Sequence, residues 1–394
     1  MLNDYTGEIG QVRRPFLYPI KCDVAVPKPK IRAIAGPLLA LVLFGLAIRL
    51  LFQEAQKISW TEFVQGITSV PPTNLAIASI LVAMNYVLYS CYDILAVRYL
   101  KKSLPLRRVI LASFIGFSLG NNLGTFMAAS PIRFRFYSRW GLSAPQIVLL
   151  ISVLGLSFWS GAWFLGGLVL TTVAIELPSE VALSLPFGTR TVGVILGSLF
   201  IGYAIACCVW KKPWPIGNLH LRLPTPGLMW VQTAVGALDL FISATALYLV
   251  LPANAVIPFG EVMAAFLIAF SIALLTQVPG GLGILEAILL KLLADSVGQS
   301  TEEISGEAAV LGTVIIFRLL YYWIPGLFGM IALVAHEIYE GVVESKGAKK
   351  HAMESHAGER YPEPGKFVES ETKPTTEPGI DDDDGKKGSE LESG

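Results

Sequence analysis

Four charged residues stand within strongly apolar stretches of this 394-residue sequence, and they are the side chains best placed to do chemistry. They occur in the segments SPIRFRF (Arg133), GALDLFISA (Asp239), PGGLGILE (Glu286) and IIFRLLYYWIP (Arg318). An ionisable side chain inside a bilayer is costly unless it is paired or faces a polar cavity. The planar guanidinium of arginine suits a phosphate group. A carboxylate can hold a cationic group or balance an arginine. These residues therefore indicate charges that face a polar cavity or a partner inside a membrane.

Each of the four charges also has a simpler structural interpretation. Asp239 and Arg318 could form a static ion pair that holds two helices together. Glu286 opens an apolar helix, where the helix dipole alone favours a carboxylate. Arg133 and its neighbour Arg135 could extend toward cytoplasmic headgroups.

Four further polar residues are candidates for the same polar cavity: Asp93, Asn121, Asn122 and Glu261. The aspartate lies just before a basic loop, so pairing with Arg98 or Arg133 explains it equally well. The two asparagines can bind a headgroup, but satisfying exposed backbone groups is their simpler role. The glutamate opens an apolar segment, and the simpler interpretation places it at the membrane interface.

Two of the four charges lie in apolar segments that are broken by glycines and small polar residues, at 109–138 and 257–293. Both segments are too long and too interrupted to be ordinary transmembrane helices. They lie 153 positions apart, and Glu286 is the counterpart of Arg133 at that spacing. A broken helix in each half of a membrane protein is typical of transporters that are built from two repeats.

The composition requires a membrane to position these elements. The chain is 53% apolar, has a mean hydropathy of +0.59, and repeatedly shows apolar stretches long enough to cross a bilayer. We therefore expect an all-α polytopic membrane protein, without a cleavable signal peptide. About six full spans are expected, at about 33–52, 74–97, 145–175, 191–210, 227–251 and 308–335.

The charges of the loops orient these spans. Basic loops belong in the cytoplasm, and acidic or neutral loops belong outside. The basic loops are 1–32, 98–108 and 211–226, and the acidic or neutral ones are 53–73, 176–190, 252–259 and 295–307. The two sets agree only if both broken segments return to the side they entered from. The sequence thus predicts two re-entrant helical hairpins, or eight hydrophobic segments in all. Eight full spans are the alternative.

The order of segments also predicts two inverted repeats, at about 33–175 and 191–335, within a transmembrane domain at 33–340. A basic N-terminal segment, 1–32, precedes this domain, and the chain is expected in the inner (plasma) membrane with both termini in the cytoplasm. The acidic tail at 341–394 cannot bury a core, so it is expected to be disordered. A docking segment for a partner is the other interpretation of this tail.

The sequence shows little evidence of an enzyme's active site. Its four histidines and four cysteines show no metal-ligand spacing, and no P-loop for direct use of ATP is present. We expect no metal, no cofactor and no catalytic residue. The basic loops are those that membrane orientation requires, so nucleic acid is not expected as a partner. The oligomeric state is left open.

Several motifs occur together in order: YDILAVRYL, SFIGFSLGNNLG, SPIRFRFYSRWGLS, VPGGLGILE and FRLLYYWIP. The region 33–340 that holds them resembles the lysylphosphatidylglycerol synthase transmembrane family, the flippase-like region of the multiple peptide resistance factors. The resemblance implies an inner-membrane protein that moves a modified phospholipid between leaflets. It carries a headgroup path over to the positions of Asp93, Arg133, Glu286 and Arg318. Only a short tail follows this region, which suggests a stand-alone member without the aminoacyltransferase domain.

The residues and the resemblance together predict a lipid flippase or scramblase-like transporter. A phospholipid or modified lipid would cross through a polar groove between the two hairpins. The alternative is a non-transporting partner, or scaffold, of a lipid-modifying or glycosyl-transferring enzyme.

Overall fold

A computed structural model describes residues 61, 68–173, 188–210, 212, 214–216, 219–253, 255–275, 279–300 and 306–360. The expected N-terminal segment, the first span at 33–52 and the tail after residue 360 lie outside these residues. The chain forms two compact units, Met1–Gly341 and Val342–Gly394. The site described below lies within the first unit.

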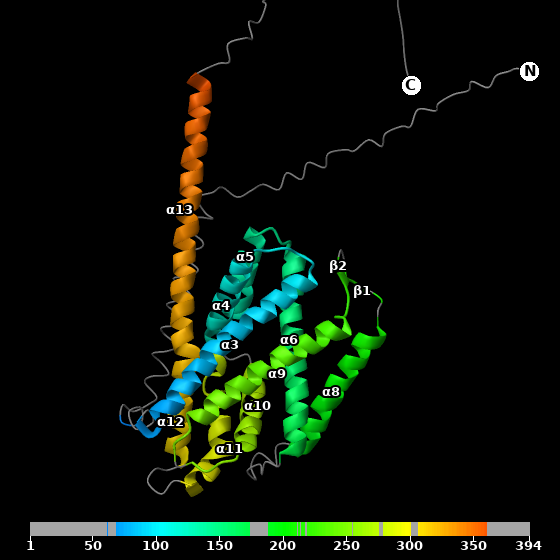
Figure 1. Cartoon of the computed structure of the whole chain (residues 1–394), viewed down its shortest axis with the longest axis vertical. Helices are drawn as coiled ribbons and strands as arrows, with labels where there is room; N and C mark the ends of the chain where they lie inside the picture. The colour runs from blue at the N-terminus through cyan, green and yellow to red at the C-terminus, as the bar shows by residue number, and fades with distance from the viewer. Residues whose placement is uncertain are drawn as a thin grey trace, which may run out of the picture. The chain divides into compact units, whose positions relative to one another are not determined.

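The described part of the chain is almost entirely helical (Figure 1). Its α-helices are α3 (Pro72–Tyr99), α4 (Leu106–Leu123), α5 (Ser130–Arg139), α6 (Ala144–Thr172), α8 (Thr189–Val209), α9 (Pro226–Leu249), α10 (Phe259–Leu275), α11 (Ile284–Ser300), α12 (Gly306–Arg318) and α13 (Ile324–Arg360). A short antiparallel hairpin of β1 (Trp214–Ile216) and β2 (Leu219–Leu221) lies in the expected basic loop 211–226. The expected helical class is therefore confirmed.

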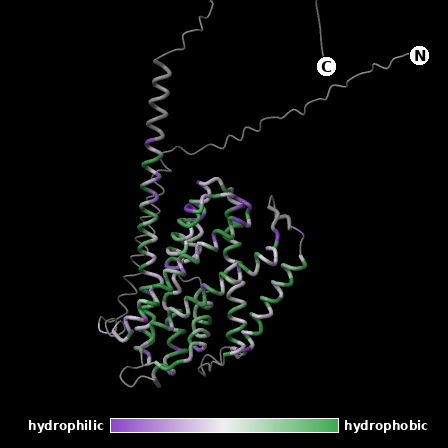
Figure 2. Tube along the Cα trace, in the orientation of Figure 1, coloured by the Kyte–Doolittle hydropathy of each residue, from purple (hydrophilic) through white to green (hydrophobic). Residues whose placement is uncertain are grey.

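Five helical stretches among the described residues are long and apolar enough to cross a membrane. They are α3, α6, α8, α9 and the stretch Ala309–Val343, which joins α12 to α13. Hydrophobic residues run along the length of these helices (Figure 2). Helix α8 shows the clearest lipid-facing surface, because its hydrophobic residues Ile195, Ile201 and Val209 are exposed. A polytopic membrane fold follows from these features.

Local sequence signals explain where several helices begin. At the start of α6, Ser143 and Gln146 form a capping box, in which the Ser143 N–H donates to Gln146 Oε1 at 3.1 Å. At the start of α9, Thr225 accepts a hydrogen bond from the Leu228 N–H. Both helices have proline in the first turn, where no backbone N–H is needed.

Glycines allow α6 to pack closely against its neighbours. A Cβ atom added to Gly236 of α9 would come 3.1 Å from Gly161 Cα of α6. A Cβ atom added to Gly167 of α6 would come 2.8 Å from Gly197 Cα of α8. Small residues of this kind let helix backbones approach within a membrane. They therefore fix α6 between α8 and α9.

Both expected broken segments are broken in the structure. In the first, α4 ends at Gly124 (φ 92°), and a π-helical turn (Thr125–Ala129) leads into α5. In the second, α10 is followed by a 3-10 turn (Pro279–Gly281) and then by α11. Gly280 and Gly281 have φ of 62° and 61°, in a region that favours glycine. In each segment the two arms pack on each other.

The C-terminal part of the chain corrects one expectation. Residues 341–360, expected to be disordered, form the end of α13. This stretch is rich in Glu, Lys and Ala, which favour helix, and the next proline after Pro325 is Pro362. The polarity of this segment therefore did not predict its conformation, because a polar segment can be helical without burying a core.

Candidate functional site

The two breaks meet inside the first unit. A Cβ atom added to Gly280 would lie 2.9 Å from the backbone oxygen of Asn122 and 3.4 Å from that of Asn121. A cavity of about 80 Å³ lies at this meeting point, lined by Asn121, Gly124, Thr125, Gly280, Gly281 and Tyr322, among others. Its volume equals that of roughly two or three water molecules. Segments distant in the sequence thus form one small, partly polar cavity, which we call the central cavity.

The two asparagines near the first break have different roles. Asn122 Nδ2 donates to the backbone oxygens of Ser118 at 2.8 Å and Tyr322 at 2.7 Å. Asn122 therefore satisfies the backbone, which was its simpler interpretation. Asn121 instead lines the central cavity, and its Nδ2 lies 3.4 Å from the hydroxyls of both Tyr86 and Tyr89.

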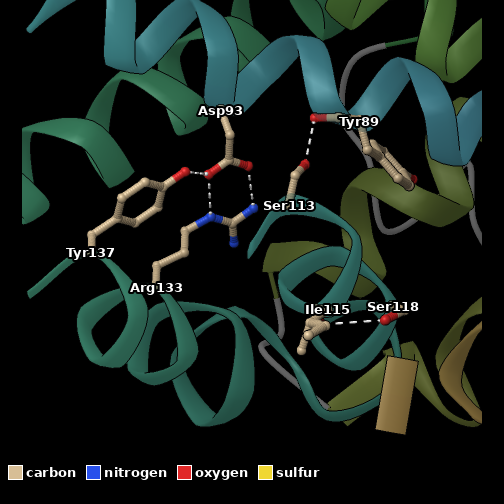
Figure 3. Close-up of polar contacts among 7 residues, drawn as sticks. All are labelled: Tyr89, Asp93, Ser113, Ile115, Ser118, Arg133 and Tyr137. Atoms are coloured by element: carbon tan, nitrogen blue, oxygen red, sulfur yellow. Dashed lines mark hydrogen bonds and ion pairs between the residues drawn. The ribbon is translucent and has the colours of Figure 1, made fainter. Parts of the chain in front are cut away.

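Arg133 of α5 pairs with Asp93 of α3 and not with Glu286 (Figure 3). Arg133 Nε and Nη2 donate to the two Asp93 carboxylate oxygens at 3.1 and 2.9 Å. The Tyr137 hydroxyl adds a third hydrogen bond to Asp93 at 2.8 Å. The guanidinium also lies 4.6 Å from the centroid of the Phe117 ring.

This pair is fully enclosed, and it anchors the first broken segment to α3. The Asp93 and Arg133 residues are 0% and 3% exposed. A Cβ atom added to Gly116 would lie 3.0 Å from Arg133 Nη1, so the absence of a side chain there makes room for the guanidinium. The interpretation of Asp93 as the partner of Arg133 is confirmed. The alternative in which Arg133 extends toward headgroups is wrong, because its charge is buried and paired.

Arg318, at the end of α12, binds three groups at the second break, and we call these contacts the clamp. Its Nε donates to Glu286 Oε1, while Nη1 and Nη2 donate to the backbone oxygens of Gly280 and Gly281 at 3.0 and 3.2 Å. The guanidinium lies 5.2 Å from the centroid of the Tyr322 ring. Glu286 Oε2 is buried without a hydrogen-bond partner among the described residues. A static Asp239–Arg318 ion pair is therefore not formed, because Glu286 is the partner of Arg318.

Asp239 of α9 is a buried acid whose partners are neutral groups. Its Oδ1 accepts hydrogen bonds from Asn85 Nδ2 at 2.8 Å and from the Tyr321 hydroxyl at 3.4 Å. Its Oδ2 accepts one from the Tyr92 hydroxyl at 2.9 Å. Within the described ranges, no Lys, Arg or His forms an ion pair with it. Asp239 does not line the central cavity.

Glu261 lies apart from these groups. It stands in the first turn of α10 and accepts a hydrogen bond from the Ser296 hydroxyl of α11 at 2.7 Å. Its observed role is to tie the two arms of the second segment together.

The structure also places residues that the sequence did not single out. Arg135, grouped above with Arg133, donates to both carboxylate oxygens of Glu337 at 2.6 Å, so it binds α5 to α13. Asn85, Tyr92 and Tyr321 surround Asp239. The spacing of Tyr86, Tyr89 and Tyr92 was a usable signal, since residues three apart share one face of a helix.

The described residues contain no group of three or more His, Cys, Asp or Glu side chains that could hold a metal ion.

Comparison with known proteins gives relatives but no matching family model. An uncharacterized protein of Synechocystis is 29% identical over 313 residues, which are 79% of this chain and 94% of the relative. The inner membrane protein YbhN of Escherichia coli is 28% identical over 320 residues, or 81% and 96% of the two chains.

Phosphatidylglycerol lysyltransferases also match. The Staphylococcus xylosus protein is 24% identical over 295 residues, 74% of this chain, and the chain spans about a third (33%) of that relative. These relatives confirm the resemblance found in the motifs. The described helices and these relatives support a multi-pass inner membrane protein, similar to YbhN-like proteins and to a part of the phosphatidylglycerol lysyltransferases.

Proposed function

We propose that this protein is a lipid flippase or scramblase-like transporter, and that a phospholipid headgroup crosses the bilayer at the central cavity. The observation that supports this most is the meeting of the two breaks at one small cavity. Irregular backbone at membrane depth is tolerated where it is buried in protein or lines a wet cavity. Two breaks in one place, flanked by buried arginine–carboxylate pairs, are better explained by a path than by a packing need.

In this proposal the two broken segments are re-entrant hairpins in inverted repeats. The first enters from the cytoplasmic side and the second from outside, with both termini in the cytoplasm. The loop charges support this arrangement, and so does the packing of the two arms in each segment. The central cavity is then the point at which both leaflets gain access to one polar site.

The cavity of about 80 Å³ corresponds to a closed state, because a phospholipid headgroup needs more room. Opening requires the two breaks to separate. Arg318 is the group whose bonds change, since its guanidinium holds the carbonyls of Gly280 and Gly281 at the cavity wall. A lipid phosphate can replace these carbonyls as the acceptor of the arginine's N–H groups.

A second cavity is suited to the acyl chains. It has a volume of about 330 Å³, has mainly apolar walls, and lies between α6, α8, α10 and α11. Its lining includes Trp163, Gly166, Leu196, Ile272 and Lys291. Helix α10 lines both cavities, so a lipid could keep its tail in the apolar one while its headgroup uses the other.

The relatives support a proposal for the substrate class. The matched lysyltransferases are named for phosphatidylglycerol, so we propose an anionic phospholipid or its aminoacylated form as cargo. The arginine at the second break supplies a cation for the phosphate. Glu286, with one free carboxylate oxygen, supplies an acceptor for a cationic headgroup.

Leaflet exchange tests the proposal directly. The full chain is reconstituted in vesicles that contain fluorescent phosphatidylglycerol, and an impermeant reductant then bleaches the outer leaflet. Wild type should expose the inner pool to bleaching, while Thr125→Trp, which fills the central cavity without removing a charge, should not. Arg190→Ala changes an exposed arginine and serves as the matched control. Exchange by wild type at the rate of empty vesicles would sink the proposal.

A non-transporting partner protein is the second candidate. Exposed hydrophobic residues Ile338, Tyr339, Val342 and Val343 on α13 favour it, because they offer a surface to a second helix. Removal of residues 345–394 followed by co-purification separates the two candidates. Loss of a stoichiometric lipid-modifying or glycosyl-transferring enzyme on truncation would support this second function.

A further inference from the structure

Asp239 differs from the other two acids of the site, the buried Asp93 and the half-buried Glu286. Asp93 and Glu286 each contact an arginine, whereas the neighbours of Asp239 are neutral. We use the name hydroxyl cluster for the groups around it: Asn85, Tyr89, Tyr92, Ser243 and Tyr321. Asp239 itself is 4% exposed. A buried carboxylate without a cation is unusual, because an unpaired charge is expensive to bury.

The hydroxyl cluster connects Asp239 to the central cavity. The Tyr321 hydroxyl lies 3.4 Å from Asp239 Oδ1, and the hydroxyls of Tyr321 and Tyr89 are hydrogen-bonded to each other. Tyr89 in turn accepts a hydrogen bond from Asn121 Nδ2, and Asn121 lines the cavity. A branch runs through Ser243, whose hydroxyl lies 2.7 Å from that of Tyr321. A continuous row of exchangeable protons therefore joins a buried acid to the cavity.

The geometry favours a proton over a metal ion as the ligand of Asp239. The amide of Asn85 and the hydroxyls of Tyr92 and Tyr321 aim hydrogens at the two carboxylate oxygens. A metal ion bound to this carboxylate would need lone pairs, not hydrogens, from the neighbouring groups. A proton needs no space of its own, and each hydroxyl can donate and accept at once.

We propose that Asp239 is a proton-binding site that exchanges with the central cavity through Tyr321 and Tyr89, and that its protonation is coupled to lipid movement. The coupling rests on the proposed transport function. Asn121 separates Tyr89 from the cavity and its amide nitrogen cannot accept a proton, so exchange requires Asn121 to turn aside and admit a cavity water to the Tyr89 oxygen. A hydronium ion there gives one proton to the Tyr89 oxygen as Tyr89 passes its own to Tyr321, and Tyr321 passes one to Asp239. One carboxylate becomes one carboxylic acid, both hydroxyls are restored, and one water molecule remains in the cavity.

The groups that face Asp239 come from three packed elements. Helix α3 supplies Asn85, Tyr86, Tyr89 and Tyr92, the π turn (Leu319–Trp323) supplies Tyr321 and Tyr322, and α9 itself supplies Ser243. Tyr322 connects these groups to the Arg318–Glu286 ion pair, because the arginine guanidinium lies 5.2 Å from the centroid of the Tyr322 ring. Protonation of Asp239 therefore changes the charge next to the clamp on the second break.

Infrared difference spectroscopy tests the proton site without any lipid transport. The purified full chain is titrated over a wide pH range, and the carbonyl band of a protonated carboxyl is followed. The band should appear on acidification in wild type and in Asp295→Asn, which changes an exposed aspartate. Asp239→Asn should lack only the part of this band that Asp239 contributes, since the other carboxyls of the chain also become protonated. An unchanged band in Asp239→Asn overturns the proton site, whatever the transport assay shows.

Tyr89→Phe tests the relay separately, since it keeps the carboxyl but breaks the row of hydroxyls. The band should persist at equilibrium but form at least tenfold more slowly after a rapid pH jump. Phe117→Leu removes the ring stacked on Tyr89 and keeps every hydroxyl, so it serves as the control. An equal rate in Tyr89→Phe and the control contradicts the relay.

Coupling is tested by lipid exchange in vesicles with an imposed pH gradient. Exchange by wild type should change severalfold with the gradient, whereas Asp239→Asn should exchange at a rate independent of it. A gradient-dependent rate in Asp239→Asn refutes the coupling while leaving transport in place. If wild type moves no lipid at all, the proposed function fails, and the infrared titration still decides the proton site.

Discussion

The two broken segments meet at the same cavity but are held by different means. The first is fixed away from its break, by a bidentate pair between Arg133 and Asp93 that is closed off from the cavity. The second is fixed at the break itself, where Arg318 binds the backbone oxygens of Gly280 and Gly281. The Arg133–Asp93 pair is closed off from the cavity, which suits a segment that does not move. A clamp that ends on backbone carbonyls can be released by a competing acceptor, so the second segment is the better candidate for the moving part.

The largest expected effect compares the two anchors. Asp93→Ala leaves Arg133 buried with no acceptor, a situation that costs about 3–5 kcal/mol. Glu286→Ala leaves Arg318 with two carbonyl acceptors, so its loss of stability should be clearly smaller. The free energy of unfolding in detergent measures both. Asp295→Ala, at an exposed position, should stay within about 0.5 kcal/mol of wild type. Equal losses in the two buried variants would remove the distinction between anchor and clamp.

The next effect concerns the clamp alone. Arg318→Lys keeps the charge but loses the fork that reaches Glu286 and both glycines together. Hydrogen bonds to charged groups contribute about 1.5–3 kcal/mol each, so losing one should raise local opening about tenfold. Amide hydrogen exchange should therefore speed up around 279–286 and stay unchanged around 121–125. Faster exchange in both breaks would mean that they open as one unit.

The sequence predicted both breaks because glycines and small polar residues interrupt long apolar runs, and such interruptions are local. It also singled out Asp239 and Arg318 as candidates for buried charges, and both residues are buried in the structure. It did not identify all the ion pairs. Arg133 and Glu286 occupy equivalent positions in the two halves of the sequence, yet Arg133 contacts Asp93 of α3 and Glu286 contacts Arg318 of α12. The partner of Arg318 depends on how α12 packs against α11, which no local pattern records.

The hydroxyl cluster was missed for a different reason. Tyr86, Tyr89 and Tyr92 look like ordinary aromatic core residues, and one face of α3 explains them equally well without any hydrogen bond. Only the packing of α3 against α9 and the π turn brings their hydroxyls to Asp239. Asparagine at position 85, in an otherwise apolar stretch, was a local hint in addition to the spacing of the tyrosines.

A smaller effect on stability compares the glycines at the two breaks. Gly280→Ala places a Cβ atom 2.9 Å from the Asn122 oxygen in a left-handed backbone conformation. The conformation alone costs about 1–2 kcal/mol, and the contact adds to it. Gly124 also has a positive φ (92°), so Gly124→Ala carries a conformational cost of its own, but it meets only open space within 4 Å and lacks the added contact, so it should cost less. Unfolding of both variants under the same conditions gives the comparison. A larger loss for Gly124→Ala would contradict the tight approach at Gly280.

The smallest expected effect compares two buried aspartates: Asp93, which forms an ion pair with an arginine, and Asp239, whose hydrogen-bond partners are neutral. Tyr92→Phe and Tyr137→Phe each remove one hydroxyl donor from a buried aspartate, Asp239 and Asp93 respectively. A typical hydrogen bond contributes about 1 kcal/mol to stability. Asp93 keeps two bonds from Arg133, whereas Asp239 keeps only neutral donors, so Tyr92→Phe should cost more at neutral pH. Acidification should narrow this gap, because a protonated Asp239 no longer needs the lost donor. A gap that stays constant from neutral to acidic pH would indicate that Asp239 does not change its protonation in that range.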